Sequence, residues 1–152
     1  MSLLLSLLLS LNMIAQNDLV VIKDKWLQYL AAFDDRIYAT APENYLTNYT
    51  RLLQTIGPQD AEQNLFNIIS RGLDHPDFLI VRAPKPAMMI TTTGDMFSIQ
   101  GAMETESEVA RIYKAYNSES NFSRVEDDAA HASTPKNRTD LNLAEWRNCF
   151  QS

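Results

Sequence analysis

Asp95 and His131 are the two residues whose types and positions in the sequence could together do acid–base chemistry. A carboxylate that accepts a hydrogen bond from Nδ1 of an imidazole fixes the tautomer and the orientation of the ring, and Nε2 is then free to take up a proton. Asp95 follows a short apolar run, and His131 follows the next strand-like segment along the chain. We therefore predict that they form the acid and the general base of one site.

The aspartate is predicted to follow a buried strand. Pro84 and Pro86 cannot donate hydrogen bonds to a sheet, so they mark the residues before a strand rather than its middle. Residues 87–92, Ala-Met-Met-Ile-Thr-Thr, carry no charge and are apolar or β-branched, which is typical of a strand buried on both faces of a parallel sheet. Gly94 supplies the turn, and Asp95 then lies beyond the carboxyl end of the strand, where ligands bind in open α/β sheets.

A helix, a second strand and a further helix are predicted to follow. From residue 101 to 116 the hydrophobic period is helical, and the side chains expected to cover the sheet are Met103, Val109, Ile112, Tyr113 and Tyr116. Residues 121–125 predict the second strand, and a loop from 126 to 134 carries the histidine. Pro135 suits the first turn of the last helix, with Thr134 or Ser133 as its cap.

The order acid, helix, strand, histidine, helix resembles the C-terminal third of an α/β-hydrolase, whose nucleophile, acid and histidine follow one another along the chain. The resemblance extends to four stretches, which look like the acetyl xylan esterase and dienelactone-hydrolase-like bacterial branch: Ala-Pro-Lys-Pro at 83–86, Gly-Asp-Met-Phe-Ser-Ile-Gln-Gly at 94–101, Asp-Ala-Ala-His at 128–131 and Ile-Gly-Pro-Gln-Asp-Ala-Glu-Gln at 56–63. The match spans roughly residues 25–137. It implies a partial α/β-hydrolase fold, with a few-stranded, mostly parallel sheet and flanking helices.

The resemblance also implies a reaction. A serine hydrolase of this kind cleaves carboxylic esters, acetyl esters and xylan-type substrates among them, through an acyl-enzyme, with His131 as the base and Asp95 as its orienter. Small esters or carbohydrate esters would be the substrates, and no cofactor is required. A prolyl-oligopeptidase-like peptidase is the alternative within the superfamily. Asp127 and Asp128 compete with Asp95 as the acid, but their closeness to the histidine in sequence predicts loop residues.

The sequence contains no Gly-x-Ser-x-Gly motif, which presents the nucleophilic serine of these hydrolases on a sharp turn between a strand and a helix. The first glycine is Gly57, and the residues before Lys23, where this turn would lie, include none. Removing the nucleophile of a serine hydrolase costs on the order of 10⁶ in turnover. We therefore expect an incomplete serine hydrolase. The alternative from another class is a non-enzymatic remnant, or a subunit that needs a partner chain.

The length of 152 residues predicts one domain. Residues 1–18 predict an apolar leader or signal-like segment, and residues 19–152 the C-terminal half of a hydrolase domain. Short strands are predicted at 19–22 and 36–40, giving three or four parallel strands with those described above. Between the first two lies an amphipathic helix, residues 23–33, with Trp26, Leu27, Leu30 and Phe33 inward.

The stretch 43–75 predicts mostly helix, interrupted by Gly57 and Pro58. By resemblance it is a helical insertion like the cap that covers the active site in this superfamily, and two packed core helices explain it equally well. His75 precedes a proline in a turn-like context, which favours a structural role over a catalytic one.

Charge and composition exclude several partners. A net charge of −6 leaves no basic stripe for nucleic acid, and the apolar leader is short for a stable membrane span. The leader favours a secreted or periplasmic location over a cytoplasmic one. Two histidines far apart and a single cysteine, Cys149, predict no metal site. A half-sheet exposes an unpaired edge, through which self-association or pairing with another chain is expected.

Overall fold

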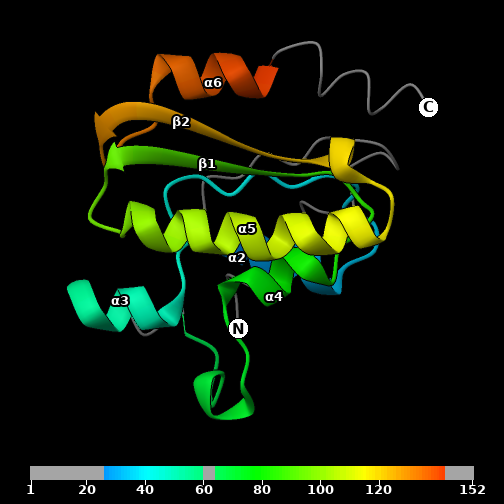
Figure 1. The fold of residues 1–152 in the computed structure, drawn as a ribbon, viewed down its shortest axis with the longest axis horizontal. Helices are drawn as coiled ribbons and strands as arrows, with labels where there is room; N and C mark the ends of the chain where they lie inside the picture. Colours follow the sequence, from blue (N-terminus) through cyan, green and yellow to red (C-terminus); the bar gives the residue numbers. More distant parts are fainter. Residues whose placement is uncertain (1–25, 60–63, 143–152) are drawn as a thin grey trace, which may run out of the picture.

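A two-stranded parallel sheet lies at the centre of the part of the chain that the computed structural model describes, residues 26–59 and 64–142. The elements follow in the order α2 (Trp26–Phe33), α3 (Tyr49–Thr55), the 3₁₀ helix η2 (Ile69–Arg71), α4 (His75–Ile80), β1 (Ala87–Gly94), α5 (Ile99–Ala115), the 3₁₀ helix η3 (Glu119–Asn121), β2 (Phe122–Ala130) and α6 (Pro135–Asn142). Helix α6 packs on one side of the sheet, and α5 packs on the other with α4 and α2 beyond it (Figure 1). This arrangement of helices on both faces of a parallel sheet confirms the predicted α/β class.

Strand β1 is buried on both faces, as predicted. Its first six residues are buried, and its last two are exposed. Ala87 and Met89 pack into one cluster with side chains of α4 and α5, among them Leu79, Val109 and Tyr113. Met88 and Ile90 pack into a second cluster with Ala39 and Ala41. Because successive side chains of a strand point to opposite faces of the sheet, alternate residues of β1 pack into two separate hydrophobic clusters.

A third segment runs along the other edge of β1 without forming a regular strand. The backbone amides of Thr40 and Asn44 donate to carbonyls of residues 86 and 90, at 3.2 and 2.8 Å, and two β1 amides donate back to the carbonyls of Thr40 and Pro42. Pro42 has no N–H, so the donor that belongs between them is missing, and two isolated bridges remain. The prediction of a regular strand at 36–40 is therefore wrong, because only isolated bridges form there. The predicted sheet of three or four strands is wrong as well, since the described residues form two. The strand predicted at 19–22 lies outside them.

Strand β2 is longer than the predicted 121–125, because pairing with β1 continues to Ala130. Asp127 and Asp128 thus lie in the strand and not in a loop. Within the described residues β2 pairs with β1 alone, and its residues are half-buried or exposed, so charged side chains are tolerated there. The last helix begins as predicted: α6 starts at Pro135, and its cap is Thr134, whose Oγ1 accepts a hydrogen bond from the amide of Asn137 at 3.1 Å.

The predicted helical content of 43–75 is wrong for most of the stretch. Only α3, η2 and the first residue of α4 are helical among its described residues. Gly57, Asn67 and Gly72 adopt left-handed backbone conformations, with φ of 84°, 59° and 72°, which a right-handed helix cannot contain. A role of this stretch as a cap stays a prediction.

The helices bury faces that differ in part from the predicted ones. Val109 and Tyr113 of α5 are fully buried as expected, but Met103 and Tyr116 are exposed, and Ala102 and Thr105 take their place. The buried positions are spaced by three or four residues, so Met103 points away by about a quarter turn. Phe33, predicted to face inward, is 77% exposed at the end of α2.

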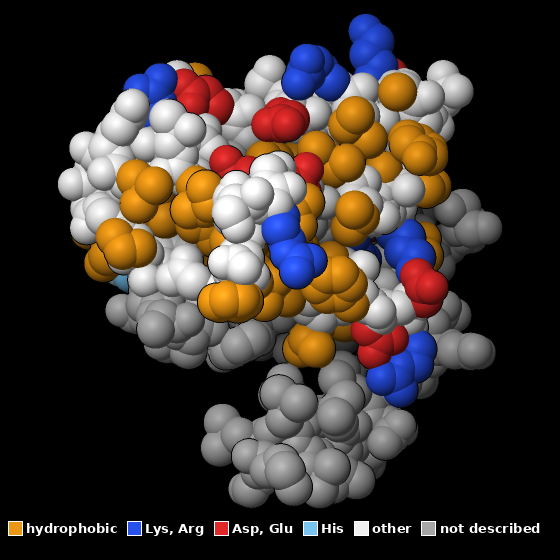
Figure 2. Space-filling model, turned by 90° about the horizontal axis from the view of Figure 1, so that it is seen from below, with side chains coloured by type: hydrophobic (Ala, Val, Ile, Leu, Met, Phe, Trp, Pro, Cys, Tyr) orange, Lys and Arg blue, Asp and Glu red, His pale blue; other side chains and the backbone are white. Residues whose placement is uncertain are grey.

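Hydrophobic side chains gather on the face that α2, α3 and α4 present, seen from below in Figure 2. Phe33, Leu53 and Val81 are more than half exposed. None of the helices in the described ranges combines the length and apolar character needed to cross a bilayer.

Candidate active site

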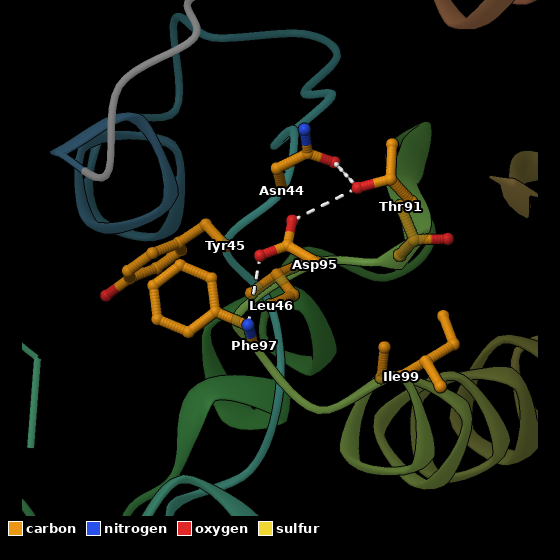
Figure 3. A pocket seen from close by; sticks show the side chains of 9 residues that line it. Asn44, Tyr45, Leu46, Thr91, Asp95, Phe97 and Ile99 are labelled. Atoms are coloured by element: carbon orange, nitrogen blue, oxygen red, sulfur yellow. Dashed lines mark hydrogen bonds between the residues drawn. The ribbon is translucent and has the colours of Figure 1, made fainter. Parts of the chain in front are cut away.

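Asp95 directly follows β1, and hydrogen bonds fix its carboxylate. The amide of Phe97 donates to Oδ1 at 2.9 Å (Figure 3), and Oγ1 of Thr92 donates to Oδ2 at 3.2 Å. Only 4% of the side chain is exposed. A buried carboxylate with such donors is held in one orientation, so its free acceptor positions are directed.

His131 directly follows β2 and completes the pair. Its Nδ1 lies 2.9 Å from Oδ1 and 3.1 Å from Oδ2 of Asp95. An ionised carboxylate only accepts hydrogen bonds, so Nδ1 carries the proton and Nε2 the lone pair. The side chain is 45% exposed, and no described residue is hydrogen-bonded to Nε2. The two predicted site residues are therefore in contact, with Nε2 free to accept a proton.

A β-bulge places Asp95 and His131 opposite each other at the end of the sheet. Thr92 pairs with Asp127, and the next pair is Gly94 with Ala130, so the single residue Thr93 opposes two residues of β2. Asp95 and His131 each come directly after this last pair. Because a shift of one residue turns a side chain to the other face of a sheet, the bulge decides whether the histidine meets the aspartate.

Phe97 supports both members of the pair. Its amide donates to Asp95, and its ring contacts the imidazole of His131 edge-on, with centroids 5.8 Å apart and an interplanar angle of 68°. The same ring contacts Tyr45 edge-on at 6.4 Å. The imidazole is thus held by a carboxylate on its Nδ1 side and by an aromatic edge.

The carboxylate of Asp95 is part of the lining of a small pocket (Figure 3). It is lined by Asn44, Tyr45, Leu46, Thr91, Thr92, Asp95, Phe97, Ile99 and Ala102. Its cavity volume is about 10 Å³, close to the smallest space that holds one water molecule, so an ester substrate does not fit inside it. The pocket is therefore a small gap beside the carboxylate, whereas the imidazole of His131 is open to solvent.

The other histidine lies apart from this pair. His75 is fully buried, its Nδ1 lies 2.9 Å from the carbonyl of Thr47, and its ring packs between Tyr45 and Tyr49. These contacts fit the structural role predicted for it, although His75 begins helix α4 rather than a turn. Across residues 26–59 and 64–142, no three His, Cys, Asp or Glu side chains are grouped to hold a metal ion. Cys149 lies outside these ranges.

Sequence reasoning missed one residue beside the pair. Asn44 is buried and donates a hydrogen bond to the carbonyl of Ala132, and its Oδ1 shares the single proton of the Thr92 hydroxyl with Asp95. The sequence could have indicated only a turn at this position, because an asparagine after Pro42 and Glu43 suits a left-handed backbone conformation. The φ of Asn44 is 52°.

No protein-family model and no curated protein matches the chain. Solved structures do resemble it. A family 15 carbohydrate esterase, the glucuronoyl esterase of Caldicellulosiruptor kristjansonii, shares 14% identity over 82% of this chain and 41% of its own, with a TM-score of 0.64. A methylesterase shares 20% identity over 82% of this chain and 28% of its own, with a TM-score of 0.62. The acylaminoacyl peptidase of Pyrococcus horikoshii shares 15% identity over 90% of this chain and 24% of its own, with a TM-score of 0.57.

This chain thus spans less than half the length of each of these three proteins. At sequence identities this low, the likeness shows a shared fold and nothing further. All three have the α/β-hydrolase fold. The described residues, with their parallel sheet between helices, match part of it. The chain has a partial α/β-hydrolase fold.

Proposed function

We propose that the chain supplies the acid and the base, Asp95 and His131, of a serine hydrolase that cleaves carboxylic esters. The observation that carries this proposal is the contact of Nδ1 with a buried carboxylate, while Nε2 has no hydrogen-bond partner among the described residues. The likeness to structures named as esterases supports the substrate class.

The proposed reaction follows from this geometry. Nε2 takes the proton of a serine hydroxyl as its Oγ attacks the ester carbonyl carbon, and Asp95 stabilises the imidazolium that forms. The imidazolium then gives the proton to the departing alkoxide, and an acyl-serine remains. A water molecule then gives a proton to the same Nε2 as its oxygen attacks the acyl carbon. The acid is released, and the imidazolium returns the proton to the departing serine oxygen.

The serine is proposed to come from outside these 152 residues. The sequence has no Gly-x-Ser-x-Gly, and no described serine hydroxyl is hydrogen-bonded to His131. The chain would then be an incomplete hydrolase whose acetyl-ester or xylan-type substrate is bound largely by another polypeptide. The outer edge of β2, which pairs with no other strand of the described residues, and the apolar face in Figure 2 offer surfaces for such pairing, or for self-association.

Two alternatives remain proposals. The acylaminoacyl peptidase favours a peptidase, but its TM-score of 0.57 is below the 0.64 and 0.62 of the esterases. A remnant without activity would also keep the fold, because fold alone does not give a function.

Hydrolysis of p-nitrophenyl acetate tests the proposal. We expect slow hydrolysis by the purified chain that His131→Ala abolishes, with no labelling by a fluorophosphonate that reacts with activated serines. Asp128→Asn, an exposed change in neighbouring β2, is the matched control and should keep the rate. Labelling of a serine would contradict the missing nucleophile, and equal rates with and without His131 would contradict its role as the base.

A further inference from the structure

Asn44 connects the two halves of the Asp95–His131 pair. It comes from the segment along the far edge of β1 and not from either strand that carries the pair. Its amide N–H donates to the carbonyl of Ile90 at 2.8 Å, which ties its backbone to the centre of β1. Only 8% of the residue is exposed.

The side chain of Asn44 reaches both sides of the site. Nδ2 donates to the carbonyl of Ala132, the residue after His131, at 2.7 Å. Oδ1 lies 3.4 Å from Oγ1 of Thr92, and the single proton of this hydroxyl is shared between Oδ1 and the Asp95 carboxylate. One amide group thus joins the backbone that carries the base to the residue that holds the acid.

The contacts of the imidazole with Asp95 and Phe97 do not fix the backbone behind it, and among the described residues few hydrogen bonds do so. His131 lies beyond the last paired residue of β2, and α6 begins only at Pro135. A backbone that leaves a strand without partners is mobile, whereas a buried hydrogen bond to its carbonyl removes that freedom. The bond from Nδ2 to Ala132 acts where the ladder of the sheet has ended.

We propose that Asn44 is a positioning residue, which holds the segment His131–Ala132 at the distance from Asp95 that the hydrogen bond to Nδ1 requires. The inference deepens the proposed function and rests on it. Asparagine suits the position for two reasons: it tolerates the φ of 52°, and its side chain both donates and accepts. Neither glycine nor aspartate meets both demands.

The test is nuclear magnetic resonance of the full chain with its two histidines labelled with ¹⁵N. Ring nitrogen shifts report which nitrogen carries the proton, so they measure the tautomer of His131 directly. In the unmodified chain we expect the Nδ1–H tautomer. In Asn44→Gly, which keeps the left-handed backbone, we expect His131 to shift towards the Nε2–H tautomer, while the resonances of buried His75 stay in place and report an intact fold.

Two further variants sharpen the result. Asn117→Gly makes the same change at an exposed residue with a φ of 53°, and both histidines should keep their spectra. Asn44→Asp keeps the oxygen that faces Thr92 but loses the donor to Ala132. His131 should therefore shift towards the Nε2–H tautomer in this variant too, and the result does not depend on whether Asn44→Gly folds.

The outcomes separate the two proposals. An Nε2–H tautomer of His131 in the unmodified chain would overturn the acid–base pair itself. An Nδ1–H tautomer that persists in Asn44→Asp, with His75 unchanged, would leave the pair intact and overturn the role of Asn44.

Discussion

Asp95 and His131 meet because each directly follows one member of the pair Gly94 and Ala130, the last pair of the parallel sheet, and their side chains lie 2.9 Å apart. Gly94 also permits the bulge that precedes this pair. A Cβ at this position would lie 3.1 Å from the carbonyl oxygen of Ala129, one of the two residues that oppose Thr93. The absence of a side chain at Gly94 is therefore part of the geometry of the site.

Replacing Asp95 by asparagine should reduce the His131-dependent hydrolysis of p-nitrophenyl acetate to the level of His131→Ala. An amide nitrogen at this position donates to Nδ1, so the proton of the ring moves to Nε2, which can no longer accept one. The measurement is the initial rate at neutral pH, with Asp128→Asn as the matched control. A rate in Asp95→Asn equal to that of the unmodified chain would show that the carboxylate does not orient the base.

Burial of His75 should make the free energy of unfolding depend on pH. Burial lowers the pKa of this histidine from its usual 6.5, and its buried Nε2 has no hydrogen-bond partner among the described residues. The unfolded chain therefore binds the proton more readily than the folded chain. The stability that the neutral ring contributes is complete above about pH 6.5 and is lost as the pH falls from there towards the folded pKa, by at most about 1.4 kcal/mol per pH unit.

Urea unfolding between about pH 5 and pH 8 measures this dependence. His75→Asn keeps a donor for the carbonyl of Thr47 but cannot titrate. We expect this variant to be less stable, and its free energy of unfolding to change less with pH in this window. His131→Asn separates out the contribution of the other histidine. An unchanged slope in His75→Asn would assign the pH dependence to other groups.

Asp74→Ala should destabilise the chain more than the loss of an ordinary helix cap. The carboxylate of Asp74 caps α4 by accepting from the amide of His75 at 2.7 Å, and it also accepts from the amide of Tyr49, the first residue of α3, at 3.0 Å. Losing one such cap costs about 1 kcal/mol, so we expect about 2 kcal/mol here.

The comparison for this prediction is Asp77→Ala, read by urea unfolding. Asp77 accepts from the amide of Asp74 at 2.7 Å and completes the capping box of α4, but α3 does not depend on it. Asp77→Ala should therefore lower the free energy of unfolding by about 1 kcal/mol. Equal losses in the two variants would mean that the bond to Tyr49 contributes nothing.

Gly101→Ala should destabilise the packing of α5 on α3. A Cβ at this position would lie 2.0 Å from Oγ1 of Thr47 and 2.9 Å from Cβ of Arg51, both on short or rigid side-chain parts. Overpacking of this kind costs about 1 to 3 kcal/mol, which outweighs the gain of up to about 1 kcal/mol in helix propensity. Ser107→Ala, an exposed change in the same helix, should leave the thermal midpoint nearly unchanged. A stabilised Gly101→Ala would show that α5 can move away from α3 at little cost.

The sequence by itself determined the elements that local chemistry dictates. Pro84 and Pro86 placed the start of β1, and the apolar run after them predicted a strand buried on both faces. Pro135 likewise placed the first turn of α6. These features depend on bonds and side chains within a few residues, so they can be predicted without the rest of the chain.

Tertiary structure alone decided how these elements meet. The bulge opposite Thr93 follows from pairing between segments far apart in sequence, and no local pattern predicts a register that changes by one residue. The contact of Asn44 with Ala132 also joins distant residues. The aspartate and the histidine could be predicted because each follows a strand, whereas their distance and the residue that bridges them depend on long-range packing.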